Sequence, residues 1–278
     1  MTSPKWAKVV RLWIGPRLSA LLALALPCLA SLAYLAIFDA PPSYLVINSA
    51  ALAGGLFWIG VGRIPESLPV RRAITVALIA LLAVPLVTGP DIHGISRWIP
   101  LGGLHLHAGM IAIPSLACLA ARDRDYAPPI ILTAILMCLV QPDAASAFAL
   151  TGAAVGLYLA WSEWKPGLVA IIGFFAALFA HVRGVIPPEP FVERVLAELA
   201  MTSPLVALTM LATMIASFLL MLRVIDQGAP ERYALAGTLA GFSLAGMISS
   251  YPSILIGYGA SPIIGFALAL GMARRERG

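Results

Sequence analysis

The sequence predicts an all-α polytopic membrane protein with about ten transmembrane helices and both termini in the cytoplasm. Apolar residues make up 60% of its 278 residues and charged residues only 11%, and the mean hydropathy is +0.94. Charged residues make up about a quarter of an ordinary soluble domain, so the composition alone excludes that class. The other two observations are the recurrence of membrane-length apolar runs and the uneven distribution of Lys and Arg between the loops that join them.

Apolar runs bounded by charged, Pro or Gly residues give the expected spans, because a helix needs about 20 apolar residues to cross a membrane. No soluble domain is left over, so we expect one transmembrane domain over residues 1–278. The basic segment 1–17 looks like the start of a signal peptide, but the run after it is long enough to span and is expected to be retained. The ten expected segments are residues 17–38, 44–61, 73–89, 106–121, 126–141, 144–161, 167–182, 204–222, 233–249 and 254–273.

The charges in the loops support this topology. With both termini inside, the cytoplasmic side holds 15 Lys and Arg residues and the outer side three, Arg97, Arg183 and Arg194. Cytoplasmic loops are enriched in these residues, and an odd number of spans would destroy the bias. The outer side also carries six Asp and Glu residues, so its arginines are potential partners for carboxylates or for an anionic ligand. The net charge of +5 is spread over short loops and does not indicate nucleic-acid binding.

Residues 94–107 place one arginine, two adjacent glycines and two histidines between the third and fourth expected helices, on the outer side. A guanidinium group at the mouth of a helix bundle can bind phosphate through its planar fork, and glycines let the backbone approach a ligand closely. The alternative is an anchor at the headgroup level, where Arg and Trp are both favoured. Arg97 and Trp98 are therefore candidates either for binding a phosphorylated ligand or for holding the helix end at the interface.

Gln141, Pro142 and Asp143 interrupt an apolar stretch on the outer side. Proline ends the incoming helix, and a carboxylate at the start of the next helix can cap its free amides. The incoming segment, residues 126–141, is about 24 Å long at 1.5 Å per residue, shorter than a bilayer core of about 30 Å. We therefore expect the turn to lie recessed in an outward cavity, where an ionisable group is a functional candidate.

The outer loop at residues 184–203 carries two carboxylates, Glu189 and Glu193. Apolar side chains recur at helical spacing from Phe191 to Leu199, with charged residues on the other side, which indicates a short amphipathic helix on the membrane surface. A solvated amphipathic connector would explain most of the same pattern.

The spacing of His and Cys indicates neither a structural metal nor a disulfide. Cys28, Cys118 and Cys138 lie inside apolar runs without a CxxC pair. His105 and His107 could in principle bind a metal from an extended loop, but no third ligand is near in the sequence. The residues therefore identify no cofactor, and assistance by a divalent metal is left open.

Three stretches, in order along the chain, resemble the SEDS family of bacterial membrane proteins, the cell shape, elongation, division and sporulation proteins related to RodA and FtsW. The family's G-x-x-RWI-x-LGG segment matches residues 94–103, and its QPD turn matches residues 141–143. Its PLPFISYGGSS segment before the last helix matches residues 252–261 more loosely, and this match includes Tyr258 and Ser261. The resemblance covers essentially the whole chain.

The resemblance implies a role in cell-wall assembly at the bacterial inner membrane. The family joins lipid II into glycan strands on the outer face, usually in complex with a class B penicillin-binding protein. An acceptor hydroxyl displaces undecaprenyl pyrophosphate, which requires a base near the acceptor and cations near the leaving diphosphate. The expected substrate-binding residues are Arg97, Trp98, Gln141, Asp143, Tyr258 and Ser261.

The chain departs from the family at two places. Where the family has a glutamate and a lysine in the fourth helix, an ungapped alignment gives Met110 and Ile113. The family's catalytic aspartate in the outer loop has no counterpart here, so Glu189 and Glu193 are proposed as catalytic carboxylates on chemistry alone. Two other functions stay open: an inactive scaffold or regulator of a penicillin-binding protein, and a transporter that flips the lipid-linked precursor.

Overall fold

The computed structural model of the protein describes residues 17–63, 67–92, 94–184, 186–223, 225 and 227–272. The helices are α2 (Leu18–Ile37), α3 (Pro42–Val61), α4 (Leu68–Ala83), α5 (Pro85–Thr88), α6 (Ala108–Ala121), α7 (Ala127–Val140), α8 (Ala144–Trp161), α9 (Trp164–Arg183), α10 (Val195–Thr202), α11 (Pro204–Arg223), α12 (Ala229–Ile248) and α13 (Ala260–Gly271). Two strands, β1 (Trp98–Leu101) and β2 (Leu104–His107), form an antiparallel hairpin. The basic residues expected before residue 17 and after residue 272 lie outside the described residues.

The prediction of an all-α polytopic membrane protein is confirmed. Each of the ten expected segments coincides with a described helix, when α4 and α5 are counted as one helix interrupted near Pro85. Within the described residues, six stretches are long and apolar enough to cross a membrane: α2, α3, α4 with α5, α8, α9 and α11. Helices α6, α7 and α13 are apolar but shorter, with 12 to 14 residues each.

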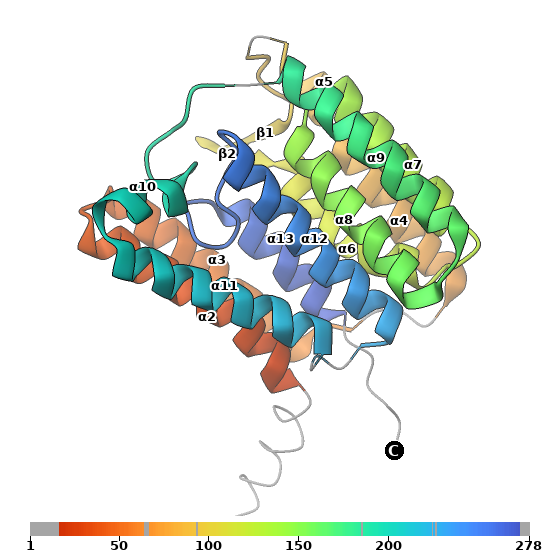
Figure 1. Cartoon of the computed structure of the whole chain (residues 1–278), viewed down its shortest axis with the longest axis horizontal. Coiled ribbons are helices and arrows are strands. Elements are labelled where there is room, and N and C mark those ends of the chain that lie inside the picture. Colours follow the sequence, from red (N-terminus) through yellow and green to blue (C-terminus); the bar gives the residue numbers. More distant parts are fainter. Residues whose placement is uncertain are drawn as a thin grey trace, which may run out of the picture.

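The helices form a bundle in which α6, α8, α12 and α13 occupy the middle (Figure 1). Helices α2, α3 and α11 pack on one side of this centre, and α4, α7 and α9 pack on the other. The hairpin, α5 and α10 lie at one end of the bundle, which is the outer end in the expected topology (Figure 1). The candidate site residues are therefore gathered at this end.

Glycines hold the central pair, α8 and α12, at backbone contact. A Cβ atom at Gly152 would lie 2.0 Å from the Gly237 carbonyl oxygen, and one at Gly156 would lie 2.1 Å from that of Tyr233. A Cβ atom at Gly241 would likewise lie 2.1 Å from the Phe148 carbonyl oxygen. Each helix therefore carries two glycines four residues apart, the spacing that lets membrane helices approach closely.

The last helix begins at Ala260 and not at residue 254, which corrects the predicted boundary. The apolar residues before it are buried as expected for a span, but their backbone bonds to the outer loop instead of continuing a helix. The Ser253 N–H donates to the Val192 carbonyl at 2.8 Å, and the Tyr258 N–H donates to the Phe191 carbonyl at 2.7 Å. Leu255, with φ of 61°, also departs from helical geometry.

The predicted helix in the outer loop exists as α10, but it begins four residues later than the apolar pattern indicated. Phe191 and Arg194 have φ of 65° and 57°, so the backbone before Val195 is not helical. The first amide of the helix, Val195 N–H, donates to Ser253 Oγ at 3.1 Å. A serine from a distant loop thus supplies the cap that the local sequence lacks.

Candidate functional site

The segment after Arg97 forms a hairpin, which was not predicted from the sequence. Trp98 pairs with His107 across the two strands, and Gly102 and Gly103 form the two-residue turn. Both glycines have positive φ, 54° and 88°, as a type I′ turn requires. A Cβ atom at either glycine would meet nothing within 4 Å, so the turn alone explains them and close approach to a ligand is not needed. The fourth expected span therefore starts at Ala108, after β2, and not at residue 106.

Arg97 is buried inside the bundle, with 1% of its surface exposed. Its guanidinium carbon lies 4.6 Å from the ring centroid of Trp98 and 5.4 Å from that of Tyr251. In the described part of the chain, its Nε and Nη1 atoms have no hydrogen-bond partner. A side chain between two rings inside the protein is not a headgroup anchor, which removes that alternative for Arg97. A buried arginine with free donors is instead suited to hold an anion.

Asp143 caps α8, as the sequence predicted. It is 1% exposed, and its Oδ1 atom accepts from the Ser146 N–H at 3.2 Å. Its other oxygen, Oδ2, lies 3.6 Å from His107 Nε2. His107 in turn caps α6, because its Nδ1 atom accepts from the Met110 N–H at 3.3 Å. The amino ends of α6 and α8 thus meet through the side chains of their two caps.

The hydrogen bond at Nδ1 defines the protonation of His107. A neutral imidazole that accepts at Nδ1 carries its proton on Nε2, which faces Asp143. Burial lowers the pKa of His107 to about 4, with Asp143 acting in the opposite direction and Arg97 in the same direction. His107 ends β2, outside the helices, and is neutral at pH 7. At 3.6 Å the Nε2 atom of His107 is too far from Asp143 Oδ2 for a hydrogen bond and has no partner in the described chain, so Asp143 faces a neutral imidazole here and not a cation.

A cavity of about 110 Å³ lies between the hairpin and the start of α13. Trp98, Tyr258 and Ser261 line it, together with His107 and Val192. Ser261 Oγ accepts from the His107 N–H at 2.8 Å, and so joins the helix end to the hairpin.

Of the predicted binding residues, three thus share this cavity, which we call the head cavity. Arg97 and Asp143 do not line it, but each contacts a side chain that does, Trp98 and His107 respectively. Tyr258 stacks on Tyr44, with ring centroids 3.6 Å apart and an interplanar angle of 5°.

Gln141 lies away from the head cavity. Its side chain is almost fully buried, and its Nε2 atom donates to the Leu82 carbonyl of α4. The amide therefore joins the end of α7 to a neighbouring helix. This contact gives Gln141 a structural role in the described chain.

The two outer-loop carboxylates differ in their surroundings. Glu189 is exposed, whereas Glu193 is half-buried and its carboxylate accepts from the Glu189 N–H. Burial raises the pKa of Glu193, and the charge of Glu189 raises it further; the hydrogen bond from Glu189 and the charge of Arg97 oppose this. Glu193 also forms a backbone bridge with Pro252, beside the head cavity. Of the two, Glu193 is therefore the carboxylate coupled to the site.

Two further residues that build this end of the bundle were not among those predicted from the sequence. Asn48 is buried in α3, donates to the Gly257 carbonyl at 3.2 Å and accepts from the Gly259 N–H at 3.1 Å. A single amide inside an apolar span is the signal that could have identified it. Tyr251, whose Oη atom has no hydrogen-bond partner among the described residues, carried no comparable signal.

The fold is similar to that of solved structures of a rod shape determining protein and of a peptidoglycan synthase complex. A mutant form of the rod shape determining protein RodA from Thermus thermophilus superposes with a TM-score of 0.63 at 20% identity, covering 98% of this chain and 96% of that one. A second RodA structure from the same organism superposes with a TM-score of 0.60 at 21% identity. The match covers 93% of this chain and 94% of that one.

A third match is a chain from a structure of a peptidoglycan synthase complex that coordinates polymerization and crosslinking. Its TM-score is 0.58 at 19% identity, covering 98% of this chain and 96% of that chain. No family model matches the sequence, and no curated protein matches it. The chain therefore has the RodA fold over nearly its whole length, which is the fold that the resemblance to the SEDS family implies.

Proposed function

We propose that this protein is a SEDS-type component of peptidoglycan assembly in the bacterial inner membrane, and that it binds lipid II at its outer end. The observation that carries the proposal is Arg97, buried beside the head cavity with Nε and Nη1 unpaired in the described chain. The similarity to RodA structures over 93–98% of the chain supports it.

The chemistry of Arg97 suits a diphosphate. A guanidinium group presents its donors in a rigid fork that matches phosphate oxygens, and the interaction is stronger in a site shielded from water. The rings of Trp98 and Tyr251 cover part of the group, because its guanidinium carbon lies 4.6 Å and 5.4 Å from their centroids. Trp98 lines the head cavity and is therefore the ring that an entering ligand meets first.

If the protein polymerises lipid II, Glu193 is the better base of the two outer-loop carboxylates. A general base works best when its pKa is near the working pH, and burial raises that of Glu193. Glu189 is exposed and serves as the matched control. A class B penicillin-binding protein is the partner expected for this activity.

One observation favours the alternative of a scaffold without catalysis. Met110 and Ile113 stand where the family has its Glu and Lys, and both are fully buried in apolar packing. No ionisable side chain replaces the lost pair at these positions. In that case lipid II binding is retained for regulation of the partner enzyme.

The test combines lipid II binding and glycan synthesis with the purified protein, alone and with a class B penicillin-binding protein, with and without Mg²⁺. Product that Glu193→Gln abolishes and Glu189→Gln preserves assigns the base. Binding without product under every condition supports the scaffold. Absence of lipid II binding refutes the proposal, and lipid II flipping in liposomes tests transport.

A further inference from the structure

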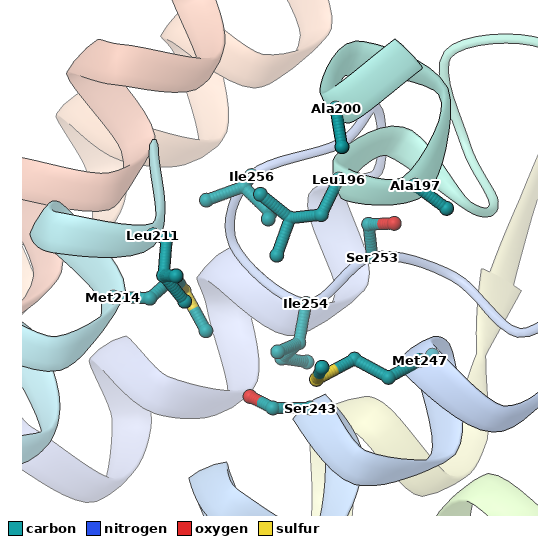
Figure 2. A pocket seen from close by; sticks show the side chains of 11 residues that line it. Leu196, Ala197, Ala200, Leu211, Met214, Ser243, Met247, Ser253, Ile254 and Ile256 are labelled. Carbon is teal, nitrogen blue, oxygen red and sulfur yellow. The ribbon is translucent and has the colours of Figure 1, made fainter. Parts of the chain in front are cut away.

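A second cavity, larger and apolar, lies next to the head cavity. It measures about 290 Å³ and is bounded by α10, α11, α12 and the loop before α13. Figure 2 shows side chains from all four segments around one space, among them Leu196, Met214, Met247 and Ile254. Among the described residues that line it, only Ser243 and Ser253 carry hydroxyl groups. We call it the chain cavity.

The chain cavity opens toward lipid. Met247 of α12 is 70% exposed and Leu211 of α11 is 40% exposed, and both helices belong to the expected membrane region. Large apolar side chains exposed at this level of a membrane protein contact hydrocarbon. A hydrocarbon chain can therefore enter the chain cavity sideways from the bilayer.

The depth of the cavity matches one leaflet. Its lining begins at α10, at the outer end, and its deepest residue on α11 is Met214, ten residues from the start of that helix at Pro204. Ten residues of helix rise about 15 Å, half of a bilayer core of about 30 Å. This depth matches what a lipid chain of the outer leaflet needs.

Ser253 belongs to both cavities. Among the described residues, Ser253 is the only one that lines both the head cavity and the chain cavity. Its Oγ atom accepts from the Val195 N–H at 3.1 Å, and its N–H donates to the Val192 carbonyl at 2.8 Å. Val192 lines the head cavity and Leu196 lines the chain cavity, so one hydrogen-bonded junction separates the two spaces.

We propose that the chain cavity holds the first part of the isoprenoid chain of the lipid-linked ligand whose diphosphate binds at the head cavity. This inference rests on the proposed function, because it assigns the two ends of one amphiphile to two adjoining cavities. The polar space beside Arg97 suits the phosphates, and the apolar space suits the hydrocarbon. Lipid tails are as apolar as the cavity wall, so the selectivity comes from packing and from the tether to the headgroup.

The first experiment fills the chain cavity and compares two ligands. Ser243→Phe and Ala200→Phe place a ring in the cavity from α12 and from α10, and Ser243 Oγ bonds only within its own helix, to the Leu239 carbonyl. The probes are undecaprenyl lipid II and a short-chain analogue with the same headgroup, measured with protein in nanodiscs. We expect lipid II to bind about threefold to tenfold more weakly to both variants and the analogue to bind unchanged.

The control is Ala212→Phe, which adds the same ring on the exposed face of α11 outside the cavity. It is expected to bind both probes like the wild type. Unchanged lipid II binding in both cavity variants, or equal affinity of the wild type for the two probes, overturns the inference and leaves the proposed function intact. A wild type that binds neither probe overturns both.

The second experiment identifies the occupant directly. A photoreactive residue in place of Leu211, which lines the cavity, is irradiated in membranes that contain lipid II. An adduct with the mass of the isoprenoid lipid supports the inference. Adducts with phospholipid only, or with a partner's transmembrane helix only, contradict it.

Discussion

Two arginine side chains of the described chain, Arg97 and Arg122, are buried at opposite ends of the bundle and have opposite surroundings. Arg122, at the end expected to be cytoplasmic, has a side chain 4% exposed; its Nε donates to Glu231 at 2.9 Å and its Nη2 to the Met272 carbonyl at 3.0 Å. Arg97, at the outer end, is 1% exposed and lies between two aromatic rings, with two nitrogens unpaired in the described chain.

This difference separates a structural arginine from a binding one. A buried guanidinium with a carboxylate partner joins α6 to α12 and leaves little capacity for a ligand. A desolvated cation–π contact contributes about 2 kcal/mol. This compensates only part of the free-energy cost of burying a charge. The unused donors of Arg97 are therefore available to an anion, and the following experiments test whether the contrast holds.

The largest expected effect is on stability at the inner end. Glu231→Gln leaves Arg122 buried without its counter-charge and is expected to destabilise the protein by about 3 to 5 kcal/mol. Thermal unfolding in detergent measures the loss. Lipid II binding per folded molecule should stay at the wild-type value; a specific loss of binding would show that the inner arginine also serves the site.

The pH dependence of stability tests the outer cluster. The folded-state pKa of His107, about 4, lies below the ordinary value of 6.5, so the unfolded chain binds the proton more readily. Stability from this group is complete above about pH 6.5 and is lost as the pH falls toward 4, by up to about 3 kcal/mol.

His107→Gln removes this titration and should flatten the stability curve between pH 6.5 and 4 relative to the wild type. Unfolding measured at several pH values for both proteins provides the comparison. Identical curves would mean that His107 is not held neutral beside Asp143.

Arg97 should matter more for binding than for stability. Arg97→Gln is expected to weaken lipid II binding about 10- to 100-fold, the effect of losing charged hydrogen bonds worth about 1.5 to 3 kcal/mol. Arg97→Lys keeps the charge but loses the fork, and an intermediate affinity is expected. Affinity for lipid II is measured by titration in nanodiscs. Unchanged affinity in both variants would mean that Arg97, like Arg122, has only a structural role.

The smallest stability effect is expected at Glu193. Glu193→Gln keeps an acceptor for the Glu189 N–H and should change stability by less than about 0.5 kcal/mol. If the protein polymerises lipid II, the same change abolishes product while lipid II still binds. A variant that retains full polymerising activity would remove Glu193 from the mechanism.

Hydropathy and loop charge were enough to predict the helices, because a span is defined by its own residues and by its flanks. Predictions failed where distant segments supply the hydrogen bonds. The stretch before Ala260 is apolar and buried like a helix, yet its amides bond to the outer loop. The hairpin was missed because its glycines were interpreted as facing a ligand, whereas positive φ in a two-residue turn explains them.

The candidate site could be predicted in part. Trp98, Tyr258 and Ser261 line the head cavity as a group. Gln141 instead bonds to α4, and Arg97 contacts the ring of Trp98 without lining the cavity itself. The sequence does not show that Tyr251, more than 150 residues later, covers the guanidinium group. Such neighbours depend on how the helices pack, which no local pattern encodes.

The glycine contact between α8 and α12 has a mechanical consequence. With carbonyl oxygens 2.0 to 2.1 Å from where a Cβ atom would stand, the two helices cannot slide past one another without a steric clash. The pair therefore forms a rigid unit at the centre of the bundle. An opening that admits a lipid must therefore come from rigid-body shifts of the outer helices relative to this central pair. The chain cavity places such a shift on the side of α10 and α11.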